Sequence, residues 1–299
     1  MIRYLKQSEI DYQKWDECIN KSTNKLIYAY SWYLDIVANQ WDAIVEGDYT
    51  SVMPLPYKKK FFIYKVYQPF FTQQLGIFSQ KLISENMVKD FLNAIPGKFL
   101  FLDVSLNSSN PFADKKSYKI EEKRTYLLDL INPYEILKKA YSENNKRNIK
   151  KAQKNKLYIK EHDNFDEIIN TFKANKGQHF PEIRPYHYRI LRQLLFTCLS
   201  KGLCLVVNAY NEHNTFCAGI VFVISGERLI FLFSGATPES RNNGAMFYLV
   251  DHVIRKYQGT ENVIDFEGSM DENLARFYRG FGSKECLYLR LKKTKLKLF

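Results

Sequence analysis

The chain has 299 residues, of which 45% are hydrophobic and 15% aromatic, and its 44 basic and 32 acidic residues give a formal charge of +12. This composition excludes intrinsic disorder, and the length favours one large or two medium-sized domains. The five cysteines include no Cys-x-x-Cys pair, which argues against a zinc site or a disulfide framework and predicts reduced thiols and no bound metal.

The sequence contains no membrane or export signal that we recognise. The first 17 residues are too charged for a secretion signal, and no apolar run approaches the roughly 18 residues that span a bilayer. We therefore expect a cytoplasmic protein with no integral membrane contact.

Hydrophobic periodicity predicts a mixed α/β domain over the first part of the chain, ending near Leu130. The expected elements are a strand at Ile2 to Leu5, a helix from about Ser8 to Asn20 with Ser8 as N-cap, an aromatic-rich helix running into a strand, a hairpin around Gly47-Asp48, a helix near Ser84 to Ala94, and two further strands.

Pro133 suits the first turn of one long helix that extends to about Asn155. Between Lys138 and Lys160 nine residues are basic and only Glu143 is acidic. Helical spacing places Lys146, Arg147, Lys150, Lys151 and Lys154 along one side, with Ile149 and Ala152 opposite. This side is either an ordinary solvated face or a phosphate-binding strip for tRNA or for the 3′-phosphate of CoA.

The following segment alternates elements in the order strand, helix, loop, helix and three strands. The expected ranges are strand 157–161, helix 166–175, loop 176–185, helix 188–201, and strands 203–210, 217–225 and 228–234. Such an order is typical of a mixed, largely antiparallel sheet covered by helices.

An amphipathic helix follows, whose apolar face runs from Met246 to Tyr257. Asn242, Asn243 and Gly244 precede it and would let a bulky anion approach the backbone N–H groups at its start. A pyrophosphate would fit there. Replacing Gly244 by Val should then abolish anion binding and leave the fold intact.

Two motifs of this region resemble the GNAT acyltransferase superfamily. Residues 241–246 (RNNGAM) are similar to its acyl-CoA pyrophosphate turn, and residues 273–282 (NLARFYRGFG) to its later Asn-x-x-Ala-x-x-Phe-Tyr segment. Met246 and the additional Gly280 depart from the family pattern. The resemblance implies acyl-CoA as cosubstrate, bound by Arg241, Asn242, Asn243, Gly244, Ala245 and Asn273.

Residues 142–152 (SENNKRNIKKA) resemble the segment that opens the second domain of FemAB-like proteins. That family pairs two GNAT-type domains across a cleft, and some members transfer an amino acid from aminoacyl-tRNA to a cell-wall precursor. The implied fold is α/β, with a degenerate N-terminal GNAT-like domain over residues 1–130 and a C-terminal GNAT domain over residues 131–299, each with a mixed, largely antiparallel central sheet.

Three residues are candidates for acid-base catalysis. In the expected strand VIDFEGS, Asp265 and Glu267 share one face near the strand's end, so Glu267 is the candidate general base and Asp265 its alternate. Either carboxylate could instead cap a helix or pair with an arginine. The resemblance implies that Tyr278 protonates a departing thiolate, whereas its apolar stripe equally fits a core tyrosine.

These features favour an N-acyltransferase that moves an acyl group from acyl-CoA to an amine bound in the interdomain cleft, by direct attack. Alternatives are a FemAB-type aminoacyltransferase that uses aminoacyl-tRNA on a cell-envelope precursor, with tRNA bound along Lys146 to Lys154, and an inactive double-GNAT binding protein. The acceptor and the oligomeric state stay open.

Overall fold

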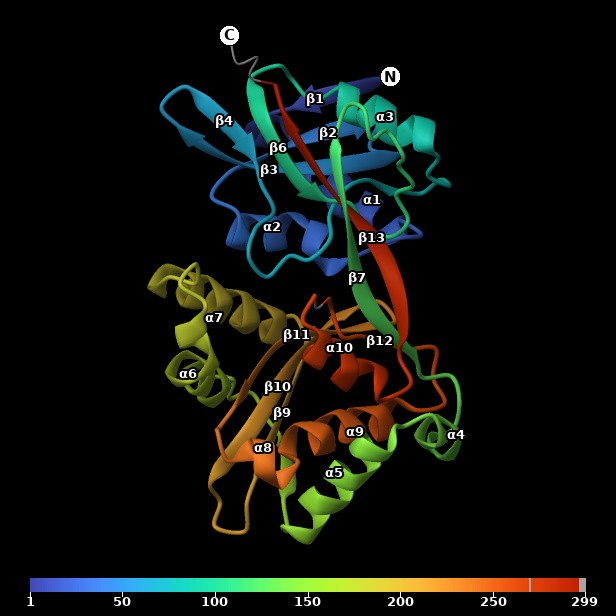
Figure 1. Cartoon of the computed structure of the whole chain (residues 1–299). Coiled ribbons are helices and arrows are strands. Elements are labelled where there is room, and N and C mark those ends of the chain that lie inside the picture. Colours follow the sequence, from blue (N-terminus) through green and yellow to red (C-terminus); the bar gives the residue numbers. More distant parts are fainter. Residues whose placement is uncertain (269, 296–299) are drawn as a thin grey trace. The chain divides into compact units, whose positions relative to one another are not determined.

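A computed structural model describes residues 1–268 and 270–295 of the chain, without the side chain of Arg241 (Figure 1). The chain forms two compact units. The first unit comprises Met1–Arg124 together with the chain from Cys286 on, and the second unit comprises Thr125–Glu285. The chain enters the second unit within strand β7 (Lys119–Asp129) and returns within strand β13 (Lys284–Thr294).

This division differs from the boundary that we expected between residues 130 and 131. The C-terminal segment belongs to the first unit because β13 pairs antiparallel with strand β6 (Phe99–Ser105), with Arg290 opposite Ser105. The paired residues are far apart in the sequence, so no local pattern signals the pairing.

The first unit is built around the sheet β1-β2-β3-β4-β6-β13, with β5 paired to β3. Besides β6, β13 and the first part of β7, the helices and strands of this unit are β1 (Ile2–Leu5), α1 (Tyr12–Lys21), α2 (Ser31–Val37), β2 (Trp41–Glu46), β3 (Ser51–Lys60), β4 (Ile63–Val66), β5 (Phe78–Ser79) and α3 (Glu85–Asn93). The strand at Ile2 to Leu5 and the helix near Ser84 are confirmed.

Helix α1 begins later than the sequence indicated. Ser8 lies in a short 3-10 turn, and the N-cap is Asp11, whose carboxylate accepts a 3.1 Å hydrogen bond from the Lys14 N–H. The buried Trp15 of this helix packs on Trp41 and donates its indole N–H to the Ala29 carbonyl. Burial of these rings anchors α1 to the sheet.

The second unit has the sheet order β7-β12-β11-β10-β9-β8, in which only β11 and β12 run parallel. Its elements are α4 (Tyr134–Lys139), α5 (Glu143–Lys154), β8 (Tyr158–Glu161), α6 (Asp166–Ala174), α7 (Pro185–Ser200), β9 (Cys204–Tyr210), β10 (Phe216–Ser225), β11 (Arg228–Ala236), α8 (Ser240–Asn243), α9 (Ala245–Tyr257), β12 (Val263–Asp265) and α10 (Glu272–Arg279). The mixed, largely antiparallel architecture is therefore confirmed.

The single long helix expected after Pro133 is wrong, because the chain breaks between α4 and α5. Ser142 caps α5 by accepting a hydrogen bond from the Asn145 N–H, and its own N–H donates to the Gly280 carbonyl. Tyr141 turns inward and packs edge-on against Phe281 at 5.2 Å. The capping serine and the buried tyrosine together stabilise the break.

Helices cover both faces of the second unit's sheet. On one face α6 packs so closely that an added Cβ on Gly219 or Gly235 would lie 2.5 Å or less from atoms of Ile168. On the other face α9 contacts β9 and β10 and packs against α5. Ile149 and Ala152 of α5 are buried there, as their spacing predicted. Within the described ranges no helix is both long and apolar enough to cross a membrane.

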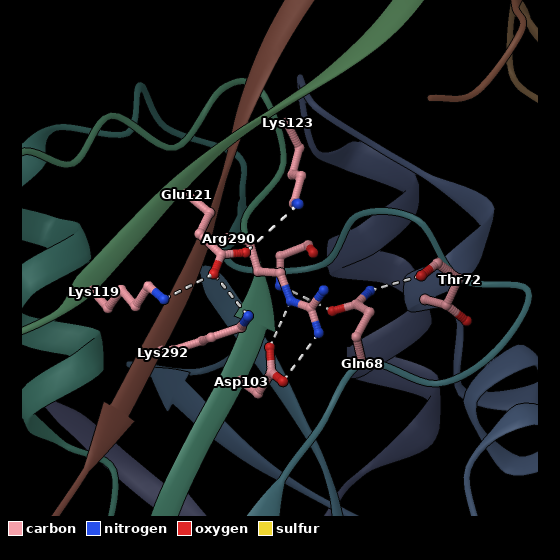
Figure 2. Close-up of polar contacts among 9 residues, drawn as sticks. Gln68, Thr72, Asp103, Lys119, Glu121, Lys123, Arg290 and Lys292 are labelled. Carbon is pink, nitrogen blue, oxygen red and sulfur yellow. Dashed lines mark hydrogen bonds and ion pairs between the residues drawn. The ribbon is translucent and has the colours of Figure 1, made fainter. Parts of the chain in front are cut away.

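Ion pairs join three strands of the first unit (Figure 2). The Arg290 guanidinium on β13 donates to both carboxylate oxygens of Asp103 on β6, at 2.6 and 3.0 Å. Glu121 on β7 lies within 3.7 Å of the ammonium groups of Lys119, Lys123 and Lys292. The hydrogen bond from Lys292 is the main cause that lowers the pKa of Glu121 from 4.5 to about 2.

The lowered pKa of Glu121 predicts a pH dependence of stability. Because the folded-state pKa lies below the ordinary value, the stabilisation is complete above about pH 4.5 and is lost as the pH falls towards 2. Glu121→Gln should flatten the fall of the melting temperature in that window, by an amount corresponding to about 1 kcal/mol or less for this partly exposed site. The neighbouring exposed Glu122→Gln is the control, and equal acid profiles for the two variants would contradict the prediction.

Candidate active site

The second unit's sheet opens where β11 and β12 separate. Their parallel pairing covers only Arg228 to Ile230 of β11 against Val263 to Asp265 of β12. Strand β11 continues to Ala236, paired with β10 alone among the described strands. The edge of β11 beyond Ile230 is therefore available to pair with the amides of a ligand.

A β-bulge lies in β11 directly beyond the point of separation. Val221 of β10 pairs with Phe233 and Phe222 with Phe231, which leaves Leu232 as an extra residue. Phe231 packs on Phe222, whereas Phe233 packs on Phe172 of α6. Residues two apart on a regular strand share a face, so the bulge accounts for the change of face. Bulges leave a backbone position without a ladder partner, and no turn or glycine signal in the sequence of β11 marks this one.

Asp265, the last residue of β12, is buried and connects β12 to β7, to β11 and to the chain that follows β12. Its carboxylate accepts a hydrogen bond from Thr125 at 2.5 Å and one from the Arg228 guanidinium at 2.9 Å, and it also accepts the Glu267 N–H at 2.9 Å. These contacts favour the arginine-paired, structural alternative for Asp265 over that of the catalytic base.

We had expected Glu267 to lie within a strand, but it lies just beyond the end of β12. Its backbone takes a positive φ of 56°, which is uncommon for a residue other than glycine. The expected alternation that put Asp265 and Glu267 on one face therefore ends at Asp265. Glu267 is half-buried, and its charge acts on Tyr278.

Tyr278 of α10 lies in an aromatic cluster. Its ring stacks on Phe266 at 4.9 Å and lies 6.1 Å from Phe231, and it is only 4% exposed. Burial, and next the charges of Glu267 and Asp265, raise the pKa of Tyr278 well above its usual 10. A tyrosine hydroxyl is protonated at neutral pH even without this shift, so Tyr278 carries a proton that it can donate, and the raised pKa makes it a weaker acid than an exposed tyrosine. The structure thus brings Asp265, Glu267 and Tyr278 together.

The proposed pyrophosphate turn forms the junction of α8 and α9. Gly244 has φ 79° and separates the two helices, and the Asn243 side chain accepts the first N–H of α9, from Ala245. Asn242 is exposed, whereas Gly244 and Ala245 are buried. The side chain of Arg241 lies outside the described part of the chain.

Gly244 meets a requirement that the sequence did not reveal. A Cβ at this position would lie 2.2 Å from the Asn148 carbonyl oxygen of α5. The glycine thus allows α5 to approach the junction, and the expectation that Gly244→Val leaves the fold intact is wrong. A valine at this position would have to adopt the positive φ of Gly244, and its Cβ would overlap the Asn148 carbonyl oxygen.

The additional Gly280 has a similar explanation. An added Cβ would lie 2.5 Å from the buried Asn145 side chain of α5. Asn145 in turn donates a 3.4 Å hydrogen bond to the Phe277 carbonyl. Asn273 lies in the first turn of the same helix, α10, where it is exposed and its N–H donates to Asp271.

The basic side of α5 faces solvent. Arg147, Lys150, Lys151 and Lys154 are exposed, and Lys146 is half-buried and pairs with Glu143 at 3.0 Å. This agrees with the amphipathic pattern and is compatible with both a solvated face and a phosphate-binding strip.

The cysteines form no disulfide, and all five are free thiols. Burial raises the pKa of Cys18 to about 11 and those of Cys198 and Cys204 to about 12. These three thiols are therefore poor nucleophiles at neutral pH. Among the residues that the structure describes, no group of three or more His, Cys, Asp or Glu side chains could hold a metal ion.

Comparison with known proteins identifies the domain that carries this site. The family model described as an acetyltransferase (GNAT) domain matches residues 139–271. The chain carries a GNAT domain. Its matched residues include the bulged strand, the α8–α9 junction and Glu267, and GNAT is an acyltransferase family. The predicted resemblance is confirmed.

Solved structures extend the likeness to nearly the whole chain. The crystal structure of FemX is 12% identical, with a TM-score of 0.66 over 94% of this chain and 96% of that one. A conserved protein of unknown function from Bacteroides thetaiotaomicron is 11% identical, with a TM-score of 0.58 over 99% and 100%. L-PGS from Bacillus licheniformis is 10% identical, with a TM-score of 0.52 over 96% and 93%. At these identities the likeness establishes the fold, which is FemAB-like. No curated protein matches the sequence.

The Gly244 contact predicts a specific loss of stability. Gly244→Ala should lower the free energy of unfolding by about 3 kcal/mol or more, because a Cβ meets a backbone oxygen in addition to the adverse φ. Gly202→Ala is the matched control, since Gly202 has φ 67° and open space around it, and should cost only about 1 kcal/mol. Thermal unfolding measures both variants. Equal losses would show that the approach of α5 is not the constraint.

Proposed function

We propose that the protein is an N-acyltransferase that moves an acyl group from acyl-CoA to an amine acceptor. The observation that carries the proposal is the separation of β11 from β12 at the bulge of Leu232, beside the buried Tyr278 and the carboxylate of Glu267. In this arrangement the exposed edge of β11 binds amides of the donor. The connection that follows β11 leads through α8 to the N-terminus of α9, which binds the diphosphate.

Glu267 is the proposed general base. It takes one proton from the substrate ammonium, directly or through water, and the neutral amine then bonds to the thioester carbonyl carbon, which leaves one excess proton on the nitrogen. The unpaired backbone at Leu232 donates to the carbonyl oxygen as negative charge develops. As the carbon–sulfur bond breaks, the excess proton on nitrogen leaves to water and Tyr278 protonates the departing thiolate. Tyr278 then regains its proton from Glu267, directly or through water, which restores both groups. Amide and free thiol are the products.

Asp265 supports this chemistry as a positioning residue. Its carboxylate accepts the Glu267 N–H and is itself fixed by Arg228 and Thr125. These contacts hold Glu267 in its unusual backbone conformation. The roles proposed for Arg241, Asn242, Asn243, Gly244, Ala245 and Asn273 remain donor binding.

An aminoacyl-tRNA donor is the second candidate, and the basic side of α5 favours it. Four exposed cations and Lys146 follow one side of this helix beside the α8–α9 junction. Such a strip neutralises phosphates, and binding that depends on it weakens steeply with salt. A cell-envelope precursor as acceptor belongs to this candidate. We place either enzyme in the cytoplasm, in keeping with the five free thiols.

Binding of the donor can be tested by thermal unfolding with CoA or acetyl-CoA. At about 100 times its dissociation constant, a ligand of the native state stabilises by roughly 2.7 kcal/mol, which should raise the melting temperature by several degrees. ATP at the same concentration controls for phosphate charge alone. If millimolar CoA does not raise the melting temperature and tRNA binds in a salt-sensitive way, the second candidate replaces the first. If neither CoA nor tRNA binds, an inactive binding protein is favoured, the hypothesis that Met246 at the turn supports.

The catalytic assignments can be tested by kinetics on the acetyl-CoA reaction with a model amine. Glu267→Gln should lower kcat about 100-fold or more, and Tyr278→Phe about tenfold or more, with donor affinity unchanged, because both groups act on protons in the transition state. Glu261→Gln, an exposed carboxylate just before β12, is the control. A normal kcat in Glu267→Gln would refute the base, and loss of the folded state would assign Glu267 a structural role.

A further inference from the structure

The hairpin of β3 and β4 in the first unit presents two phenylalanines to solvent. Phe61 is 79% exposed and Phe62 is 92% exposed, and the adjacent Ile63 is 43% exposed. They form the tip of a hairpin that projects from the sheet at the left of Figure 1. Large apolar side chains exposed side by side usually mark an interaction site.

The turn itself makes the two aromatic residues unexpected. Lys60 pairs with Ile63, so Phe61 and Phe62 alone form the loop, and Phe61 has a positive φ of 53°. Two-residue hairpin loops with a positive φ usually place Gly, Asn or Asp at such positions. A phenylalanine there is strained and contributes little to the core, so its presence points to a role outside folding.

Lysines surround this apolar tip. Lys58, Lys59, Lys60 and Lys65 are all exposed, and the chain contains no acidic residue between Asp48 and Glu85. The hairpin therefore joins exposed aromatic rings to a local charge of +4 without any carboxylate of its own. This combination fits a negatively charged surface with an apolar interior.

One face of the hairpin also forms an open groove of about 540 Å³. Its walls are Lys58, Lys60 and Lys65, and its apolar part is Phe61, Ile63 and Phe101. Because Lys60 lies opposite Ile63 and Lys58 opposite Lys65 across the two strands, ammonium groups and apolar side chains line the same face. An amphiphile with an anionic headgroup matches both parts.

We propose that this hairpin docks the protein on an anionic lipid bilayer, with Phe61 and Phe62 inserted at the headgroup level and the three lysines of the groove around lipid phosphates. The proposal is independent of the acyl transfer site, which lies in the second unit. A single-stranded RNA would also meet lysines and aromatic rings, but it needs rings presented as stacking platforms along a strand-tracking groove. Two adjacent rings at a hairpin tip, continued by an aliphatic Ile63, suit hydrocarbon better.

The test is flotation of the full chain with vesicles of phosphatidylcholine alone or with about 30 mol% phosphatidylglycerol. The parent protein should bind the anionic vesicles only, less tightly as salt rises. Phe61→Ser/Phe62→Ser should weaken binding about tenfold or more, and each of Lys58→Gln, Lys60→Gln and Lys65→Gln about fivefold. A Phe62→Trp variant should show a blue shift of its emission on these vesicles.

Matched controls separate docking from general adhesion. Phe196→Ser removes a 69% exposed phenylalanine from α7, and Lys150→Gln removes one exposed lysine from α5, the same charge as each single lysine variant of the hairpin; both should bind vesicles like the parent. Melting temperatures check folding, and Phe62→Ser alone serves if the double variant is unstable. The proposal would be overturned if the phenylalanine substitutions left vesicle binding unchanged, or if the α5 control lost as much vesicle binding as the hairpin lysine variants. It would also be overturned if soluble glycerophosphate at equal concentration competed with the vesicles, or if the hairpin bound single-stranded RNA in place of vesicles.

Discussion

The buried carboxylate of Asp265 is the contact on which the second unit's site depends. It joins β12 to β11 through Arg228 and to β7 through Thr125, and it fixes the chain after β12 by accepting the Glu267 N–H. Breaking one partner of such a buried pair is far more costly than the pair's net contribution. The end of β12, the opening beside β11 and the position of Glu267 are therefore set by one side chain.

Sequence periodicity was sufficient for most of the architecture. Apart from α8, the strands and helices between residues 157 and 257 lie within a few residues of their expected ranges, because most of them bury an apolar face on one side of the sheet or the other. The break between α4 and α5 was missed, since Tyr141 and Ser142 are explained by contacts with Phe281 and Gly280 far along the chain. The turn at Phe61 and Phe62 contains none of the residues that normally mark a turn.

The candidate site was predictable as a set of residues but not as a geometry. The motifs pointed to Glu267 and Tyr278, which lie in the same region. The bulge at Leu232 cannot be seen in a continuous run of buried apolar residues, because it depends on pairing with β10. Gly244 and Gly280 were assigned to a ligand turn and to a departure from a motif. Both glycines also allow the close approach of α5. The sequence alone does not show whether a glycine is needed for such an approach or for backbone freedom.

The return of β13 to the first unit bears on the order in which the protein folds. The second unit is one continuous segment, from Thr125 to Glu285, whereas the first unit's sheet lacks β13 until the residues beyond Glu285 have been synthesised. Before then β6 presents unpaired backbone groups along the side that β13 covers. The second unit can therefore complete its core on the ribosome before the first unit has its last strand, β13. Aggregation during synthesis should then begin from β6.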